Sequence, residues 1–149
     1  MASRSPQLSG WGRLPVPGRE IRSEDLGAVA RDRPLTRGLG RSYGDASLPP
    51  AGAPEVAGSA RADRLPAFDP ETGVLRAEAG LALREILRLF LPRGFWPPAS
   101  PGTAFVTLGG MVAADVHGKS HHRDGSFGRH VRALRMLLAD GSIVDCDRA

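Results

Sequence analysis

The stretch that decides the fold is Arg37-Gly38-Leu39-Gly40-Arg41-Ser42-Tyr43-Gly44-Asp45. It places three glycines within seven residues, so backbone N–H groups can converge on an anion without side chains in the way. A dinucleotide-binding turn of the Rossmann type would need a buried strand before the loop and a helix beginning inside it. Residues 31–36 (RDRPLT) precede the loop without a run of apolar residues, and proline-rich residues 47–50 follow it, so both are missing. The stretch predicts either a diphosphate-binding loop of another kind or a tight turn.

A second glycine-rich segment covers residues 101–119 and reads PGTAFVTLGGMVAADVHGK. Thr107 is placed to cap a short helix that starts at the pair Gly109-Gly110. Free N–H groups and the helix dipole at that end would stabilise negative charge, and the missing side chains permit close approach. The alternative is a helix of small residues packed on a sheet. Two such segments in one chain are less expected by chance than either one.

The most regular patterns lie in the second half of the chain. Residues 73–79 alternate between apolar and polar, which predicts a half-buried strand after a turn at 69–73. Apolar residues spaced three and four apart predict a helix over 83–90, broken by Pro92 and capped by Gly94. Residues 131–138 and 142–146 flank Asp140-Gly141, which predicts a hairpin.

Regular structure is harder to find in the first half. Residues 1–20 show no apolar period, so they are expected to form a flexible arm in which only Trp11 docks, followed by a domain over 21–149. Ser23 is expected to cap a short helix that ends before Pro34. Residues 47–60 are rich in proline, glycine and alanine and are expected to be a loop, with only a weak strand remnant at 65–68. Short strands mixed with two helices favour an α+β domain.

Composition limits the class of protein. The chain has 149 residues, 41% of them hydrophobic and 24% charged, as in one globular domain. The net charge of +4 suits anionic ligands. The single cysteine, Cys146, excludes an internal disulfide framework. Because there is neither a long apolar window nor a secretory signal, we expect a cytoplasmic protein, with peripheral membrane or periplasmic association left open.

Three other interpretations remain open from the residues. His117, His121 and His122 could bind a metal ion, although Gly118 and Gly125 interrupt any helix beneath them. A basic nucleic-acid module is disfavoured because the arginines are scattered and aromatic residues make up only 5%. A truncated remnant without independent activity is consistent with every residue.

Taken together, RGLGRSYGD, PGTxxVTLGGxxAADVHGKxHH and GSFGxHV resemble the FAD-binding domain of the vanillyl-alcohol oxidase / p-cresol methylhydroxylase (PCMH) superfamily. Within it, the likeness is to the sugar and sugar-lactone oxidases. The resemblance implies an α+β, FAD-binding PCMH-type domain. Because members of the family continue for several hundred residues, the domain is expected to be incomplete here and the C-terminal half to be missing.

The resemblance also implies roles for particular residues. The first loop would wrap the FAD diphosphate and adjoining ribityl atoms through Thr36, Arg37, Gly38, Leu39, Gly40, Arg41, Ser42, Tyr43, Gly44, Asp45 and Ala46. Further backbone donors to the cofactor would come from Gly102, Thr103, Thr107, Leu108, Gly109 and Gly110. The residues along the flavin would be Ala114, Asp115, Val116 and His117. His117, as the flavin-proximal histidine, and Lys119, near the same pocket, are the candidate catalytic residues, and no metal is implied.

One departure from the family bears on the chemistry. Many members attach FAD covalently through a histidine just before the serine of the first loop, where this chain has Arg41. An arginine stays protonated and is no nucleophile at ordinary pH, so FAD is expected to be bound non-covalently. The family reaction would oxidise the CH–OH group of a sugar, sugar lactone or polyol by hydride transfer to the flavin. This chain alone is expected to bind FAD weakly and to turn over little or no substrate.

Overall fold

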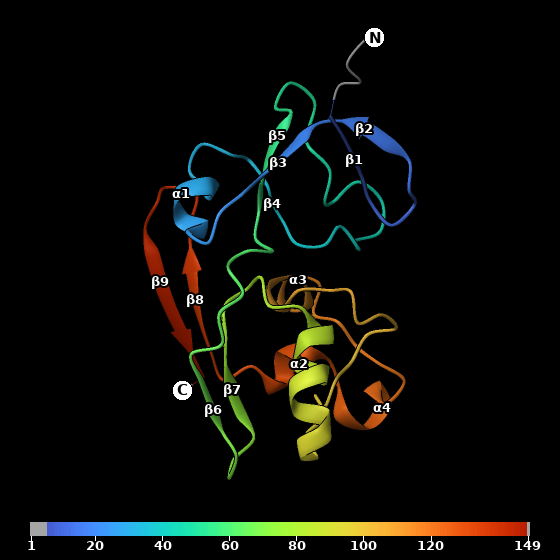
Figure 1. Ribbon diagram of the computed structural model, residues 1–149, viewed down its shortest axis with the longest axis vertical. Helices are drawn as coiled ribbons and strands as arrows, with labels where there is room; N and C mark the ends of the chain where they lie inside the picture. The colour runs from blue at the N-terminus through green and yellow to red at the C-terminus, as the bar shows by residue number, and fades with distance from the viewer. Residues whose placement is uncertain (1–5, 149) are drawn as a thin grey trace.

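The computed structural model describes residues 6–148. Figure 1 shows two parts, one above the other: an upper part with β1 to β5 and α1, and a lower part with β6, β7 and α2 to α4. The hairpin β8–β9 runs along one side and reaches up to α1, where the Leu137 side chain lies beside Gly27. Strands and helices are mixed throughout, as expected for an α+β domain.

The N-terminal residues are part of the fold. β1 (Gln7–Ser9) pairs antiparallel with β2 (Pro15–Pro17), and β3 (Arg19–Arg22) follows directly. The expectation that residues 1–20 lack regular structure is therefore wrong for residues 7–20, while residues 1–5 lie outside the described part. The expectation failed because three-residue strands are too short to show an apolar period, and their partners lie elsewhere in the chain.

The centre of the upper part is β5 (Glu55–Gly58), which pairs in parallel with β3 on one side and with β4 (Thr36–Arg37) on the other. Val56 and Ala57 are fully buried. The prediction of a loop over 47–60 is wrong at this strand. Its small residues reflect crowding, because a Cβ at Gly58 would collide with the side chains of Glu20 and Arg22, which cross it from β3.

The short helix α1 (Leu26–Ala30) lies where the sequence predicted one, with Val29 buried. Its cap is Asp25 rather than Ser23, because the Asp25 carboxylate accepts from the backbone N–H of Ala28 at 3.0 Å. The Ser23 hydroxyl instead accepts from the backbone N–H of Asp25 at 3.1 Å.

The lower part contains the apolar core. β6 (Ala67–Asp69) and β7 (Val74–Arg76) form a hairpin, and α2 (Leu83–Phe90) packs on it and continues into η1 (Leu91–Arg93), which ends at left-handed Gly94. Leu81, Ile86 and Phe90 are buried together, and Phe68 lies 4.3 Å from Phe90 between ring centroids. The helix predicted over 83–90 is confirmed, and the strand predicted over 73–79 is present in shorter form.

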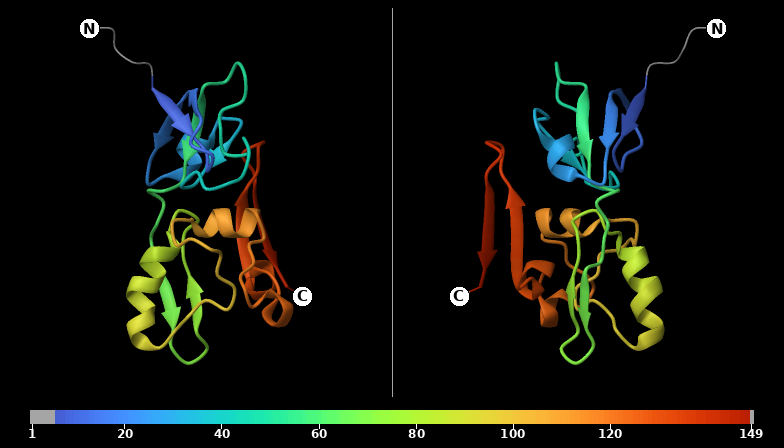
Figure 2. Two further views of the ribbon diagram at one scale, coloured as in Figure 1. Left: turned by 90° about the vertical axis from the view of Figure 1, so that its right-hand side faces the viewer. Right: turned by 60° about the vertical axis from the view of Figure 1, so that its left-hand side comes forward.

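The remaining elements carry the second glycine-rich segment and the end of the chain. α3 (Leu108–Ala113), α4 (His121–Asp124) and η2 (Phe127–His130) lead into β8 (Ala133–Leu137), which pairs antiparallel with β9 (Ile143–Asp147), as predicted. The two views of Figure 2 place the β6–β7 hairpin between α2 and β8–β9. None of the helices in residues 6–148 has the length and apolar character needed to cross a membrane.

Candidate functional site: two glycine-rich segments in contact

The fold brings the two glycine-rich segments into direct contact. Gly38 of the first loop lies against the side chain of Thr107, so closely that a Cβ on Gly38 would collide with the Thr107 hydroxyl and lie 3.2 Å from its methyl carbon. In Figure 1, α3 lies at the top of the lower part, just below the first loop. Segments about 70 residues apart in sequence thus form one surface.

The first loop presents its backbone to solvent. Residues 41–46 are all exposed, and Gly40 and Gly44 have φ of +66° and +58°, in the left-handed region that glycine favours. Among the described residues, no protein acceptor lies within hydrogen-bond distance of the backbone N–H groups of residues 38–45. Residues 41–45 are exposed, so their N–H groups are available to an anionic ligand, whereas Gly38 and Leu39 are half-buried and Gly40 is buried.

The side chain of Arg37 points the other way. It is buried, and its two terminal nitrogens donate to the backbone carbonyl oxygens of Ser47 at 2.6 Å and Ser9 at 2.7 Å. The predicted role of Arg37 in cofactor binding therefore rests on its place in the loop and not on a guanidinium aimed at solvent.

The second segment differs from expectation in its donors. Thr107 caps α3 as predicted, and its hydroxyl accepts from the N–H of Gly110 at 3.2 Å. The N–H groups of Leu108 and Gly109 donate to the carbonyls of Leu81 and Ala79 at 2.9 and 2.8 Å. The free N–H groups expected at the start of the helix are thus bonded within the protein, and the role of these residues in cofactor binding stays a prediction. Gly109 is needed for close packing, since a Cβ there would lie 3.1 Å from that of Ala79.

The second glycine-rich segment is joined to the start of α2 by further backbone hydrogen bonds. The N–H groups of Leu83 and Arg84 donate to the carbonyls of Val106 and Ala104, each at 2.9 Å. Gly102 is exposed and has no atom within 4 Å of a Cβ added to it, whereas Thr103 uses its hydroxyl to accept from the N–H of Phe105. Of the predicted donors in this segment, Gly102 has the most open surroundings.

Residues 114–117 form a tight turn after α3. Asp115 has φ of +40°, and its carboxylate accepts from the N–H of Gly128 at 2.7 Å. Hydrogen bonds from the Ser126 hydroxyl and from this N–H hold the pKa of the Asp115 carboxyl below its usual range. Asp115 thus ties the turn to η2. Ala114 is exposed and Val116 is half-buried.

The two candidate catalytic residues, His117 and Lys119, are exposed. His117 forms an isolated bridge with Ser126, and its ring centroid lies 5.2 Å from that of His121. Their predicted catalytic roles stay predictions. Within the described residues no group of three or more metal-ligating side chains comes together, so His117, His121 and His122 do not form the metal site considered from sequence.

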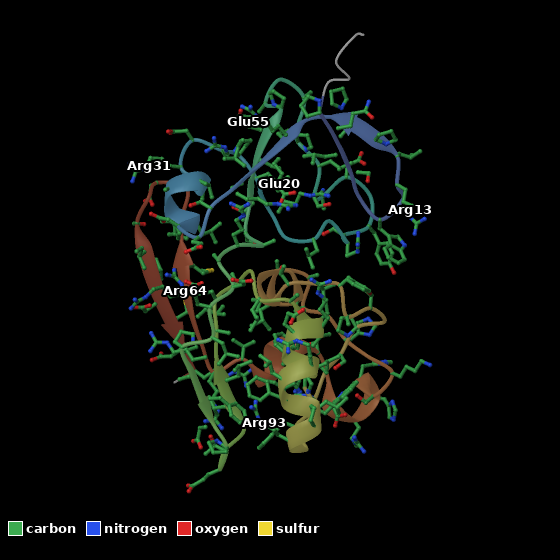
Figure 3. All side chains as sticks on the ribbon, viewed as in Figure 1. Arg13, Glu20, Arg31, Glu55, Arg64 and Arg93 are labelled. Atoms are coloured by element: carbon green, nitrogen blue, oxygen red, sulfur yellow. The ribbon has the colours of Figure 1, made fainter. Side chains whose placement is uncertain are left out.

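Sequence reasoning missed Gly10 and Glu20 on the N-terminal side of the first loop, whereas Trp11 was expected to dock. A Cβ on Gly10 would lie 3.2 Å from the carbonyl oxygen of Gly44, and the Trp11 ring meets Tyr43 edge to face at 6.5 Å. Glu20 lies in the middle of the upper part (Figure 3). The turn-forming run Gly-Trp-Gly-Arg at residues 10–13 was the signal for a hairpin here.

The glycine-lined surface and the α+β layout define a class of protein, the FAD-binding domains. Residues 28–147 match the family model described as an FAD binding domain, and the chain belongs to this family. Its cofactor is FAD, and the expected PCMH-type fold is confirmed.

Particular relatives agree with this family. The chain is 37% identical over 148 aligned residues, 92% of its length, to a decaprenylphosphoryl-beta-D-ribose oxidase of Mycolicibacterium smegmatis. It is 32% identical over 84 residues to a D-2-hydroxyglutarate dehydrogenase of Escherichia coli. An alkyldihydroxyacetonephosphate synthase shares the fold with a TM-score of 0.69 over 87% of the chain, at 15% identity.

The chain is much shorter than these proteins. It covers 32% of the ribose oxidase, 8% of the E. coli dehydrogenase and 26% of the synthase chain.

Proposed function

We propose that this chain binds the diphosphate of FAD across the contact between its two glycine-rich segments, and that it serves an oxidoreductase acting on a CH–OH group. The observation that carries the proposal is the contact of Gly38 with Thr107, which joins a loop whose N–H groups donate no hydrogen bond to the protein to a segment whose N–H groups do. The ribose oxidase and the D-2-hydroxyglutarate dehydrogenase among the relatives support a sugar or hydroxy acid as substrate class.

The two glycine-rich segments would make different contacts with FAD. The exposed backbone of residues 41–46 would donate to the phosphate oxygens, which carry negative charge and accept several hydrogen bonds. The second segment would supply a fixed wall and, through Gly102, an open backbone position. The turn held by Asp115 would set the position of His117 relative to that wall.

The residues available also favour a non-covalent cofactor. Arg41 is exposed on the first loop, at the position where covalent members of the superfamily have a histidine. Its guanidinium stays protonated, so it contributes positive charge near the phosphates and no nucleophile. When bound, FAD supplies the hydride acceptor for oxidation of the alcohol carbon.

The direct test is a titration of the full chain with FAD, followed by quenching of flavin fluorescence, with Gly110→Asp as the disrupting variant. Gly110 is exposed at the start of α3, so an aspartate there adds negative charge beside the first loop. We expect saturable quenching by the wild type and an affinity at least about tenfold lower for Gly110→Asp.

A matched control adds the same charge elsewhere. Ala139→Asp lies at the exposed turn between β8 and β9 and should bind FAD as the wild type does. After denaturation and filtration, the flavin should appear in the filtrate. Absence of quenching by the folded wild type, or equal weakening by both variants, would contradict the proposed site, and flavin retained on the denatured protein would contradict non-covalent binding.

A further inference from the structure

The buried guanidinium of Arg37 links the first loop to the N-terminal strands. Its side chain is 9% exposed and lies between three separate parts of the chain. Its terminal nitrogens reach Ser47 at the end of the first loop and Ser9 in β1, and its Nε lies 3.6 Å from the carboxylate of Glu20 in β3. Since Arg37 itself begins the loop, one side chain connects both ends of the loop to the N-terminal strands.

Arg37 and Glu20 form a buried pair of opposite charges. Burial lowers the pKa of the Arg37 guanidinium, and the charge of Glu20 acts in the opposite direction. The Glu20 side chain is only 6% exposed and also accepts two hydrogen bonds from Arg22, each at 2.9 Å. A buried charge of this kind is tolerated when its partners are fixed, so the guanidinium holds the surrounding backbone to one geometry.

The loop backbone is shaped around the guanidinium. Gly40 lies against it, so that a Cβ there would collide with the terminal nitrogen of Arg37. The hairpin turn adds a second contact, since Gly10 packs on the carbonyl of Gly44. Ser9, Gly10 and Glu20 all precede residue 28, where the match to the family model begins.

We propose that Arg37 is a positioning residue that holds the first glycine-rich loop in its FAD-binding form by joining both ends of the loop to the β1–β2 hairpin and to Glu20. The hairpin is then a working part of the cofactor site. This inference rests on the proposed function for its binding consequence, but the ordering of the loop can be measured without FAD.

The first experiment is limited trypsin digestion of the full chain without cofactor. Arg41 lies in the exposed part of the loop, and Arg93, exposed at the end of η1, is a reference site in the other part of the molecule (Figure 3). In Arg37→Gln we expect cleavage after Arg41 to accelerate about tenfold relative to cleavage after Arg93, because the loop opens locally. Equal acceleration at both sites would mean general unfolding, and no acceleration at Arg41 would mean that Arg37 does not order the loop; either result would overturn the proposal.

The second experiment measures FAD affinity of the same folded variants by fluorescence quenching. Arg37→Gln should weaken FAD binding about tenfold. Arg37→Lys should weaken it nearly as much, because a single ammonium group cannot contact Ser47, Ser9 and Glu20 together. Arg61→Gln, an exposed arginine, is the control and should bind normally. Wild-type affinity in a variant whose loop is cleaved faster would overturn the positioning role, whereas failure of the wild type to bind would contradict the proposed function alone.

Glu20→Gln keeps a folded protein available if the Arg37 variants are unstable. It preserves the size of the side chain and removes the charge that faces Nε, so both readouts should change in the same direction by about threefold. Combined with Arg37→Gln it should add little, because both changes act on one network. Fully additive effects would show that the two residues act separately and would overturn the proposed network.

Discussion

The two glycine-rich segments use the same residue type for opposite purposes. In the first loop, two glycines have positive φ, and the N–H groups of residues 38–45 donate no hydrogen bond to the protein. In the second segment, glycine allows backbone to approach backbone, and the N–H groups of Leu108, Gly109 and Gly110 all have protein acceptors. In the proposed site, the first loop would be the binding surface and the second segment would support it.

The two segments are also stabilised by different contacts. The second segment is held by neighbouring backbone in the lower part, next to the core of α2. The first loop has few such bonds and depends on Arg37 and the N-terminal hairpin. Glycine content alone does not distinguish a ligand-binding loop from a packed one. The two kinds of segment differ in whether their backbone N–H groups have acceptors within the protein.

The largest effect should come from Gly40→Ala. Its φ of +66° strains any L side chain, and its Cβ would also collide with the Arg37 guanidinium, so we expect a loss of about 2–4 kcal/mol in unfolding free energy. Gly44→Ala is the matched variant, with φ of +58° and no atom within 4 Å, and should lose only about 1–2 kcal/mol. Urea denaturation measures both. Equal losses would show that contact with Arg37 has no part in shaping the loop.

Gly38→Ala tests the contact between the segments. The added methyl would displace the Thr107 side chain, and we expect a loss of about 1–3 kcal/mol together with weaker FAD binding. Gly102→Ala, in the second segment with no atom within 4 Å, should leave the unfolding free energy unchanged. The two variants are compared by urea denaturation, and Gly38→Ala is compared with the wild type by FAD titration. If Gly38→Ala matched the control, the two segments would not be in close contact in solution.

A smaller effect is expected for Thr107→Ala. It removes the cap of α3 and leaves the N–H of Gly110 without its acceptor, which should cost about 1 kcal/mol. Thr107→Ser keeps the hydroxyl and should restore most of the loss. Thermal unfolding of the three proteins provides the comparison, and an unstable serine variant would assign the effect to the lost methyl group instead.

The smallest effect concerns Asp115 and appears only in acid. Because hydrogen bonds lower the pKa of its carboxyl in the folded protein below 3.8, the ionised form contributes stability at pH values above 3.8. This contribution disappears as the pH falls through the lowered folded-state value. Asp115→Asn should therefore be less stable than wild type at pH 6, and the difference should shrink below pH 3.8. A difference that stayed constant with pH in urea titrations would contradict the assignment.

Elements that depend on near neighbours in sequence were predictable. The apolar stripe of α2, the Asp-Gly turn of β8–β9 and the Thr107 cap are each decided within a few residues, and each is present. β5 was missed because its identity as a central strand depends on β3 and β4, which lie about 20 to 36 residues earlier. The strand has few large apolar side chains because Glu20 and Arg22 occupy the space above Gly58.

The amino-acid sequence by itself indicated the class of protein through the resemblance of its two glycine-rich segments to a known family, whereas the glycines and the capping threonine alone left a tight turn and a packed helix open. It also determined that Arg41 stands where a covalent histidine would be. Only the tertiary structure decided which N–H groups remain available, since that depends on acceptors such as Ala79 and Leu81 that come from another part of the chain. It likewise decided that Arg37 faces inward, because the partners of a buried charge are brought together only by folding.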